Sequence, residues 1–160
     1  MAINEGLHPR VQQVQQALHA GGVDVTVKQI DESTPTAAAA ADFLGCDVGA
    51  IANSLVFMAD DEPILVLTSG AHRVDTAHLA ERIGAGKVRR ASAEQVLAAT
   101  GQVIGGVAPL GHPAPVRTYL DMALLEYDEL WAAAGIPASL FSITYADLLR
   151  VTGAIEVEVD

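Results

Sequence analysis

Residues 54–68 read Ser-Leu-Val-Phe-Met-Ala-Asp-Asp-Glu-Pro-Ile-Leu-Val-Leu-Thr. Two apolar, partly β-branched runs, residues 54–59 and 64–68, flank the turn-forming residues 60–63. Short apolar runs joined by such residues are typical of neighbouring strands in a hairpin. This stretch therefore predicts two buried antiparallel strands, around which the rest of the chain is expected to be arranged.

Helix and strand signals alternate on both sides of this hairpin. Apolar spacing, caps and terminal glycines predict helices at residues 11–18, 75–83, 92–100 and 145–151. Another helix is predicted to begin at Pro35, with Thr34 as its cap, and to end at residue 44. Further strands are predicted at residues 23–27, 87–90, 116–120, 129–133, 140–143 and 155–159. Most connections are too short for parallel crossovers. We therefore expect one α+β domain over residues 1–160, with a largely antiparallel or mixed β-sheet surrounded by helices.

The composition is that of an ordinary folded domain. The chain has 160 residues, 51% of them hydrophobic, which excludes intrinsic disorder. Its single cysteine, Cys46, cannot form an internal disulfide, and no Cys/His cluster has zinc-ligand spacing. Neither a signal peptide nor an apolar run of about 18 residues is found. We expect a cytoplasmic protein with no membrane partner.

The charge is unevenly distributed along the chain. A net charge of -11 argues against tight binding to nucleic acid, and no DNA partner is expected, because Lys and Arg supply most phosphate affinity. Residues 63–117, however, hold six basic and three acidic side chains and no aromatic residue. Ordinary charge scatter is one explanation. Weak, transient contact with phosphates is the other.

The sequence does not support three common kinds of site: a serine hydrolase, a metal site and a reactive cysteine. Ser54, Ser69, His72 and Asp75 lie close in sequence, but no Gly-x-Ser-x-Gly motif is present, and Asp75 fits a helix cap. The five histidines have no metal-ligand spacing, so neither a metal nor a cofactor is expected. Cys46 follows a helix end without a nearby cation, which favours an inert buried thiol.

Residues 105–113, Gly-Gly-Val-Ala-Pro-Leu-Gly-His-Pro, are unlike the rest of the chain. Three glycines and two prolines predict a loop of fixed and unusual backbone conformation. Its unobstructed N–H groups could approach a ligand carbonyl or oxyanion. A structural turn between strands is the alternative. The loop lacks the Lys-Ser/Thr ending of a phosphate-binding loop, so phosphate transfer is not supported.

Motifs in a fixed order extend from residue 31 to residue 159. They are residues 52–56 (Ala-Asn-Ser-Leu-Val), 65–70, 91–96, 100–101, 105–111 and 147–150, together with Asp121 and Gly135. This order resembles the YbaK/EbsC family, free-standing relatives of the editing domain of bacterial prolyl-tRNA synthetase. The Gly-Gly-x-x-Pro-x-Gly loop is its most specific part. The resemblance implies aminoacyl-tRNA deacylation, in which a wrong amino acid such as cysteine or alanine is removed from a prolyl or related tRNA.

The resemblance also implies where the chemistry takes place. An aminoacyl ester is already activated, so a positioned water and a tRNA ribose hydroxyl suffice without a covalent nucleophile. Matching positions give catalytic roles to Asn53, Gly105, Gly106 and Asp121, and substrate-binding roles to Ser54, Ser69, Val107, Pro109, Gly111, His112 and Gly135. For the acceptor end of the tRNA, the available phosphate contacts are Arg73, Arg82, Lys87, Arg89 and Arg90, with Arg117 in addition.

The sequence departs from the family pattern at Asn53. The best-known editing members have a lysine there, and asparagine keeps the hydrogen-bonding capacity but loses the charge. Three hypotheses follow. The chain is a trans-editing deacylase, a non-catalytic module that binds tRNA or a small molecule, or a regulatory protein that recruits an aminoacyl-tRNA synthetase.

Overall fold

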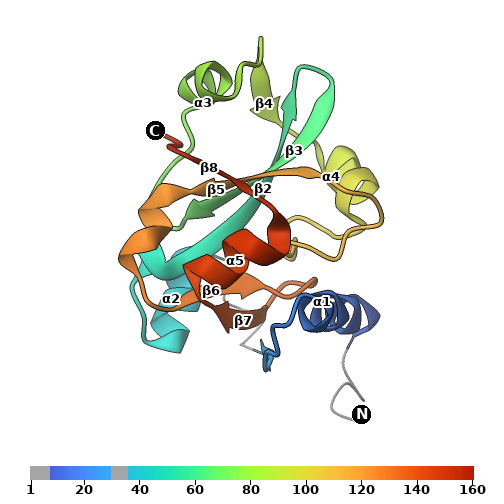
Figure 1. The fold of residues 1–160 in the computed structure, drawn as a ribbon, viewed down its shortest axis with the longest axis vertical. Coiled ribbons are helices and arrows are strands. Elements are labelled where there is room, and N and C mark those ends of the chain that lie inside the picture. Colours follow the sequence, from blue (N-terminus) through green and yellow to red (C-terminus); the bar gives the residue numbers. More distant parts are fainter. Residues whose placement is uncertain (1–7, 30–35) are drawn as a thin grey trace.

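The computed structural model describes residues 8–29 and 36–160. Its strands are β1 (Lys28–Gln29), β2 (Ile51–Ala59), β3 (Glu62–Ser69), β4 (Val88–Arg90), β5 (Arg117–Asp121), β6 (Leu130–Ala133), β7 (Ser139–Ile143) and β8 (Ile155–Val157). Its helices are α1 (Pro9–Ala20), α2 (Ala37–Leu44), α3 (Thr76–Ile83), α4 (Ala93–Thr100) and α5 (Tyr145–Thr152), with 3₁₀ turns η2 (Val48–Ala50) and η3 (Met122–Glu126). The α+β class expected from the sequence is confirmed (Figure 1).

One sheet joins all the described strands in the order β1-β7-β6-β2-β3-β5-β8, and β4 pairs with β2 beside this path. The predicted hairpin is β2–β3, with Asp60 and Asp61 as its turn. Sequence neighbours β2–β3 and β6–β7 are antiparallel, whereas β2–β6, β3–β5 and β5–β8 are parallel. The sheet is therefore mixed, because its parallel partners are separated by segments long enough to cross over.

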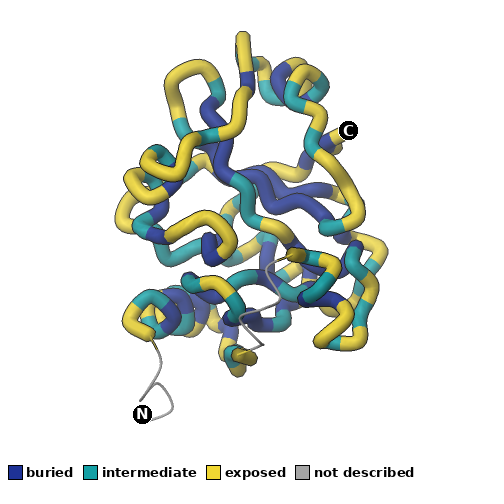
Figure 2. The backbone as a smooth tube through the Cα atoms, turned by 180° about the vertical axis from the view of Figure 1, so that it is seen from behind, coloured by how far each residue is buried: buried dark blue, intermediate teal, exposed yellow. Residues whose placement is uncertain are grey.

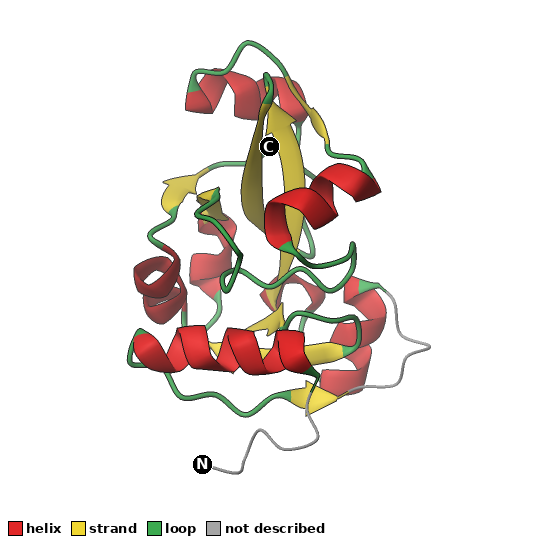
Figure 3. Cartoon of the chain, turned by 90° about the vertical axis from the view of Figure 1, so that its right-hand side faces the viewer, coloured by secondary structure: helices red, strands yellow, loops and turns green. Residues whose placement is uncertain are grey.

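The two faces of the sheet are covered by different helices. Apolar residues of α1 and α5 pack with Leu65, Leu67 and Leu120 on one face. Leu79 of α3 packs with the alternate strand residues, such as Val66, on the other face. The helices α1 and α3 lie at opposite ends of the molecule (Figures 1 and 3), and the most deeply buried backbone follows the central strands (Figure 2). No helix in the described ranges is long and apolar enough to cross a membrane.

The helix boundaries follow local capping chemistry. Asp75 caps α3 through the N–H of His78, and Ser92 with Gln95 forms the predicted capping box of α4. Thr144 caps α5 as expected. These three helices end at glycines in the left-handed conformation, which glycine adopts without steric cost.

Two predictions of local structure need correction. Residues 23–27 alternate in burial, and Val23 is buried in the core, but only Lys28–Gln29 pairs with another strand. Side-chain alternation against a core does not require a hydrogen-bonded ladder, so the strand predicted at residues 23–27 was wrong. The Thr34 cap and Pro35 lie outside the described residues. Within them α2 begins at Ala37, and the hydroxyl of Thr36 accepts a hydrogen bond from the N–H of Ala39 at 3.1 Å.

Candidate functional site

The two edges of β2 are paired very differently. One edge pairs with β3 from Ala52 to Ala59. The other edge pairs with β6 only at Ile51 and Ala52, and with β4 only from Phe57 to Ala59. In the described part of the chain, residues 53–55 therefore have no strand partner on this second edge. We call residues 53–55 the free edge of β2.

The backbone of Ser54 points toward the gap along this edge. The N–H of Gly70 donates to the carbonyl of Ile51, so residues 51, 53 and 55 bond to β3 in the alternation of an antiparallel ladder. Residues 54 and 56 then face the other way, and the carbonyl of Val56 accepts a hydrogen bond from the N–H of Ala91. The N–H and carbonyl of Ser54 are left facing the gap.

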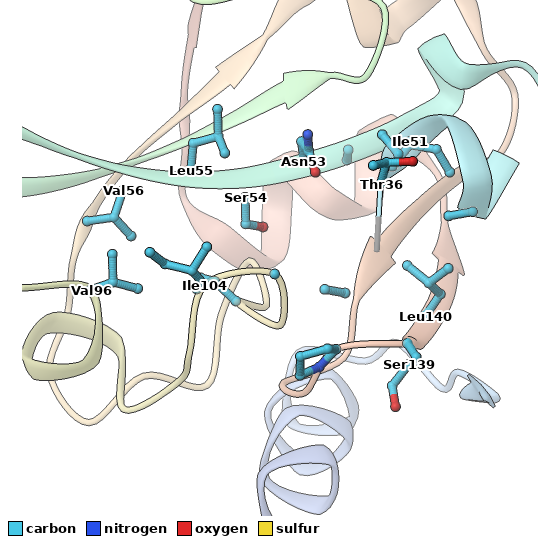
Figure 4. Close-up of a pocket in the computed structure, with 18 of the residues that line it drawn as sticks. Thr36, Ile51, Asn53, Ser54, Leu55, Val56, Val96, Ile104, Ser139 and Leu140 are labelled. Atoms are coloured by element: carbon cyan, nitrogen blue, oxygen red, sulfur yellow. The ribbon is translucent and has the colours of Figure 1, made fainter. Parts of the chain in front are cut away.

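A cavity of about 480 Å³ opens at the free edge (Figure 4). We call residues 105–113 the glycine loop. The described lining residues come from α2, β2, β4, α4, this loop with the residue before it, and the β6–β7 connection. They are Thr36, Ala37, Ala40, Ile51, Ala52, Asn53, Ser54, Leu55, Val56, Arg90, Ala91, Val96, Ile104, Gly105, Val107, Ala133, Pro137, Ala138, Ser139 and Leu140. Most are apolar and small, none is His, Cys, Asp or Glu, and Arg90 is the single charged residue among them.

The hydroxyl of Ser54 is buried and has no hydrogen-bond partner in the described residues. It points into the cavity on the same side of β2 as Val56, while Asn53 and Leu55 point to the opposite side (Figure 4). Ser139 also has a buried hydroxyl without a partner, but that oxygen points away from Ser54. An unpaired buried hydroxyl costs about 1–3 kcal/mol, so Ser54 is ready to bond to a ligand.

The glycine loop forms the opposite wall of the cavity and is held by backbone contacts. A Cβ atom on Gly106 would lie 2.6 Å from the carbonyl carbon of Ile136 and from the nitrogen of Pro137, so only glycine fits. The N–H of Gly106 donates to the carbonyl of Val103 at 2.9 Å. The N–H groups of Gly105 and Val107, both at the cavity, have no acceptor among the described residues. These two N–H groups are therefore candidate donors to a ligand.

The position of the loop depends on Gln102, a residue that the sequence patterns did not single out. Its side chain is 1% exposed, and its Oε1 accepts the N–H of Ala108 at 2.8 Å. The hydroxyl of Thr100 donates to the carbonyls of Val96 and Gln102. A buried amide that bonds to a glycine-rich loop six residues later has no periodic signature, so only the structure identifies it.

Asp121 and Ser69 lie outside the cavity. Asp121 is 1% exposed, and its carboxylate accepts the N–H of Ser69 at 3.0 Å, the hydroxyl of Thr68 at 3.2 Å and the N–H of Ala123 at 3.0 Å. The hydroxyl of Ser69 donates to the carbonyl of Gly49 at 2.7 Å. These bonds join β3, β5 and η2. Roles for Asp121 and Ser69 in catalysis or substrate binding stay predictions.

Four further predicted residues do not line the cavity. Gly111, with φ 84°, packs against Val14 of α1, and Gly135, with φ 111°, packs against the backbone of Arg10. Pro109 is buried, and Nε2 of His112 lies 2.8 Å from the carbonyl oxygen of Ala108. Burial lowers the pKa of His112 below its ordinary value, although the bond to Ala108 opposes this shift.

The predicted phosphate contacts separate into different environments. Arg90 lines the cavity, whereas Lys87 and Arg89 line a second hollow with Asp60 and Asp61. Three others line neither hollow: Arg82 pairs with Glu158 at 3.2 Å, and Arg73 and Arg117 are exposed. Only Arg90 is thus brought to the free edge.

Metal ligands and reactive thiols are not gathered at the cavity. Within residues 8–29 and 36–160, no group of three His, Cys, Asp or Glu side chains could hold a metal ion. Burial, followed by the carboxylates of Asp47 and Glu129, raises the pKa of the Cys46 thiol. The raised pKa favours the protonated thiol of Cys46, which is less nucleophilic than a thiolate, although the residue is half-buried and not buried as predicted.

Comparisons with known proteins first show similarity in sequence. The chain is 32% identical over 123 residues to the uncharacterized protein YwhH of Bacillus subtilis (strain 168), covering 76% of this chain and 78% of that protein. It is 31% identical to the proline–tRNA ligase of Nitratidesulfovibrio vulgaris (strain DP4), covering 70% of this chain but only 21% of the ligase. The match is therefore to one part of the much longer ligase.

A solved structure extends the similarity to the whole fold. A crystal structure described as a "putative trans-editing enzyme for prolyl tRNA synthetase" superposes with a TM-score of 0.90 at 40% identity, covering 97% of this chain and 99% of that one. The family model for the aminoacyl-tRNA editing domain matches residues 31–151, which include the free edge and the glycine loop. With this match over most of its length, the chain belongs to the aminoacyl-tRNA editing domain family.

Proposed function

We propose that this protein is a trans-editing aminoacyl-tRNA deacylase that hydrolyses the ester of a small amino acid on a mischarged tRNA. The observation that carries the proposal is the cavity between the free edge of β2 and the glycine loop, found in a member of the editing-domain family. Prolyl or related tRNAs are the substrates we propose, with the acceptor end as the bound part. We place the reaction in the cytoplasm.

The walls of the cavity support selection of a small side chain. Alanines from several different elements line it, at positions 37, 40, 52, 91, 133 and 138. A pocket of limited size admits a smaller wrong amino acid and excludes a larger correct one, which is the logic of a second sieve. Alanine and cysteine are therefore the side chains we expect to be removed.

The polar groups at the cavity suit hydrolysis by positioning. A water attacks the ester carbonyl, the bond from that carbon to the ribose oxygen breaks, and the ribose oxygen takes up a proton. The neighbouring ribose hydroxyl assists the water, because none of the described lining residues is an acid, a base or a thiol. The N–H groups of Gly105 and Val107 are candidate donors to the developing oxyanion. The carbonyl of Ser54 is a candidate acceptor for the α-ammonium group.

The direct test is a panel of tRNAs. The protein is incubated with tRNA-Pro carrying alanine, cysteine, serine, threonine or proline, and release of the amino acid is measured against buffer. We expect release of at least one small amino acid and none of proline. Absence of release above the buffer rate for every tRNA would overturn the deacylase proposal.

A second candidate is a non-catalytic binding module of the same fold. The observation that favours it is the uncharged side chain of Asn53 at a position where the family's best-known members have lysine. This candidate expects charged tRNA to bind without turnover, and turnover to appear in Asn53→Lys. Turnover by the unmodified protein would eliminate it.

A further inference from the structure

Arg90 is the only charged residue among the described residues that line the cavity. The chain as a whole carries a net charge of -11, so a cation at this position is not a consequence of composition. No acidic side chain in the described lining neutralises it, and no ion pair holds Arg90 within the described residues. Its guanidinium is therefore available to an anion.

The backbone fixes where this cation stands. Arg90 lies directly opposite Phe57 in the β2–β4 pair, and its guanidinium carbon is 5.6 Å from the centre of the Phe57 ring. Directly opposed side chains lie on the same face of a sheet, and Asn53 and Leu55 share that face with Phe57 by alternation. Arg90 thus stands at the end of the free edge, on the Asn53 side, with a flat apolar ring beneath its charge.

The chemistry of the proposed substrate limits what this cation can bind. An amino acid joined through its carboxyl group as an ester has lost its negative charge and keeps only an ammonium group. The nearest anion is then the phosphate on the 5′ oxygen of the same nucleotide. A guanidinium presents a planar array of donors that matches two phosphate oxygens.

We propose that Arg90 binds the 5′-phosphate of the terminal nucleotide and so positions the aminoacyl ester at the free edge of β2. This proposal rests on the proposed function, because it takes the aminoacyl group to occupy the cavity. In this proposal Arg90 of β4 supplies the positive charge that the uncharged side chain of Asn53 in β2 does not provide. Arg89, the adjacent cation, lines the hollow that contains Asp60 and Asp61 and is not expected to take part.

The test compares ligands that differ by one phosphate. The probes are 3′-alanylamino-3′-deoxyadenosine, a stable amide analogue, and its 5′-monophosphate, with binding measured by calorimetry. We expect the unmodified protein to bind the phosphorylated probe about 10- to 100-fold more tightly, the range of a charge-assisted pair. Arg90→Gln should lose this preference, and Arg90→Lys should keep part of it. The matched control Arg89→Gln should retain the full preference.

Several outcomes would overturn the proposal. They are an equal affinity of the unmodified protein for both probes, an undiminished preference in Arg90→Gln, or an equal loss in Arg89→Gln. Thermal unfolding of each variant checks that the fold is retained, and Arg90→Lys preserves the test if Arg90→Gln unfolds. Binding of the analogues does not require turnover. If no amino acid is released from any tRNA in the panel, the deacylase proposal fails. The preference for the phosphorylated probe, measured by calorimetry, still tests the role of Arg90.

Discussion

The two edges of β2 show how one strand serves both stability and function. Along the edge shared with β3, paired residues are buried in apolar clusters on both faces of the sheet. Along the opposite edge, pairing stops between β6 and β4, and the buried hydroxyl of Ser54 has no partner. The paired edge satisfies its own polar groups. The free edge leaves such groups for a ligand, and the surrounding core has to offset that cost.

The paired edge should respond to mutation through stability alone. Leu67, opposite Ser54 in β3, is 0% exposed, and Leu67→Ala should lower the free energy of unfolding by about 2–5 kcal/mol. Urea unfolding measures this loss, and deacylation per folded molecule should change little. Leu97→Ala is the control, since Leu97 is 47% exposed and its loss should cost about 0.5 kcal/mol or less. Equal effects of the two variants would contradict the assignment of Leu67 to the core.

The wall opposite the free edge should be sensitive to a single methyl group. Gly106→Ala forces the glycine loop away from Ile136 and Pro137, at a cost of about 1–3 kcal/mol. Because both segments shape the cavity, deacylation should fall about 100-fold. Gly105→Ala has open space around its Cβ and tests only the strain of φ 90°, so its activity should fall less. An unchanged rate in Gly106→Ala would show that the loop is not part of the site.

Ser54→Ala should separate stability from activity. Removing a buried hydroxyl that has no partner should leave the free energy of unfolding unchanged or raise it by about 1 kcal/mol. Deacylation should nevertheless fall about tenfold, the value of one hydrogen bond to substrate. The matched control is Ser139→Ala, whose hydroxyl is also unpaired but points away from Ser54. A loss of stability in Ser54→Ala without a loss of rate would reverse the interpretation.

The smallest expected effect concerns His112 and pH. Its pKa is lowered in the folded state from an ordinary value of 6.5, so the unfolded chain takes up the proton first as the pH falls. The contribution of neutral His112 to stability is therefore complete above pH 6.5 and is lost as the pH falls through and below it. Urea unfolding from about pH 8 to about pH 5 should show a decline that is shallower in His112→Gln. Identical slopes would contradict the burial of the neutral ring.

Much of the local structure was predictable because its causes are local. The hairpin follows from apolar runs around Asp60 and Asp61, and α4 from the reciprocal bonds of Ser92 and Gln95. The glycine loop was recognisable from composition, and Ser54, Val107 and Gly105 do line one cavity. By contrast, the strand predicted at residues 23–27 was wrong, since burial alternates there without a partner strand.

The candidate site was only partly predictable. Asn53 and Ser54 are adjacent in sequence, yet they project from opposite sides of β2 (Figure 4). Asp121 carries the residue type expected of a catalytic group, but its carboxylate is occupied by bonds that join strands. No sequence pattern identified Gln102, whose side chain bonds to the glycine loop, or Ile104, which lines the cavity. The alternation of residues along a strand predicts which side of the strand each side chain faces. It does not predict which other segments of the chain lie across the cavity from that strand.

By itself, the sequence determined the hairpin, the helix caps and the glycine loop, because each depends on residues within a few positions of one another. It also determined the family resemblance, because the order of motifs along the chain can be read without the fold. Only the tertiary structure decided that β6 and β4 pair with the two ends of β2 and leave residues 53–55 free between them. Those pairings join segments far apart in the chain, and their hydrogen bonds form only once the sheet is assembled. The same assembly brings Arg90 to the cavity and keeps Asp121 away from it.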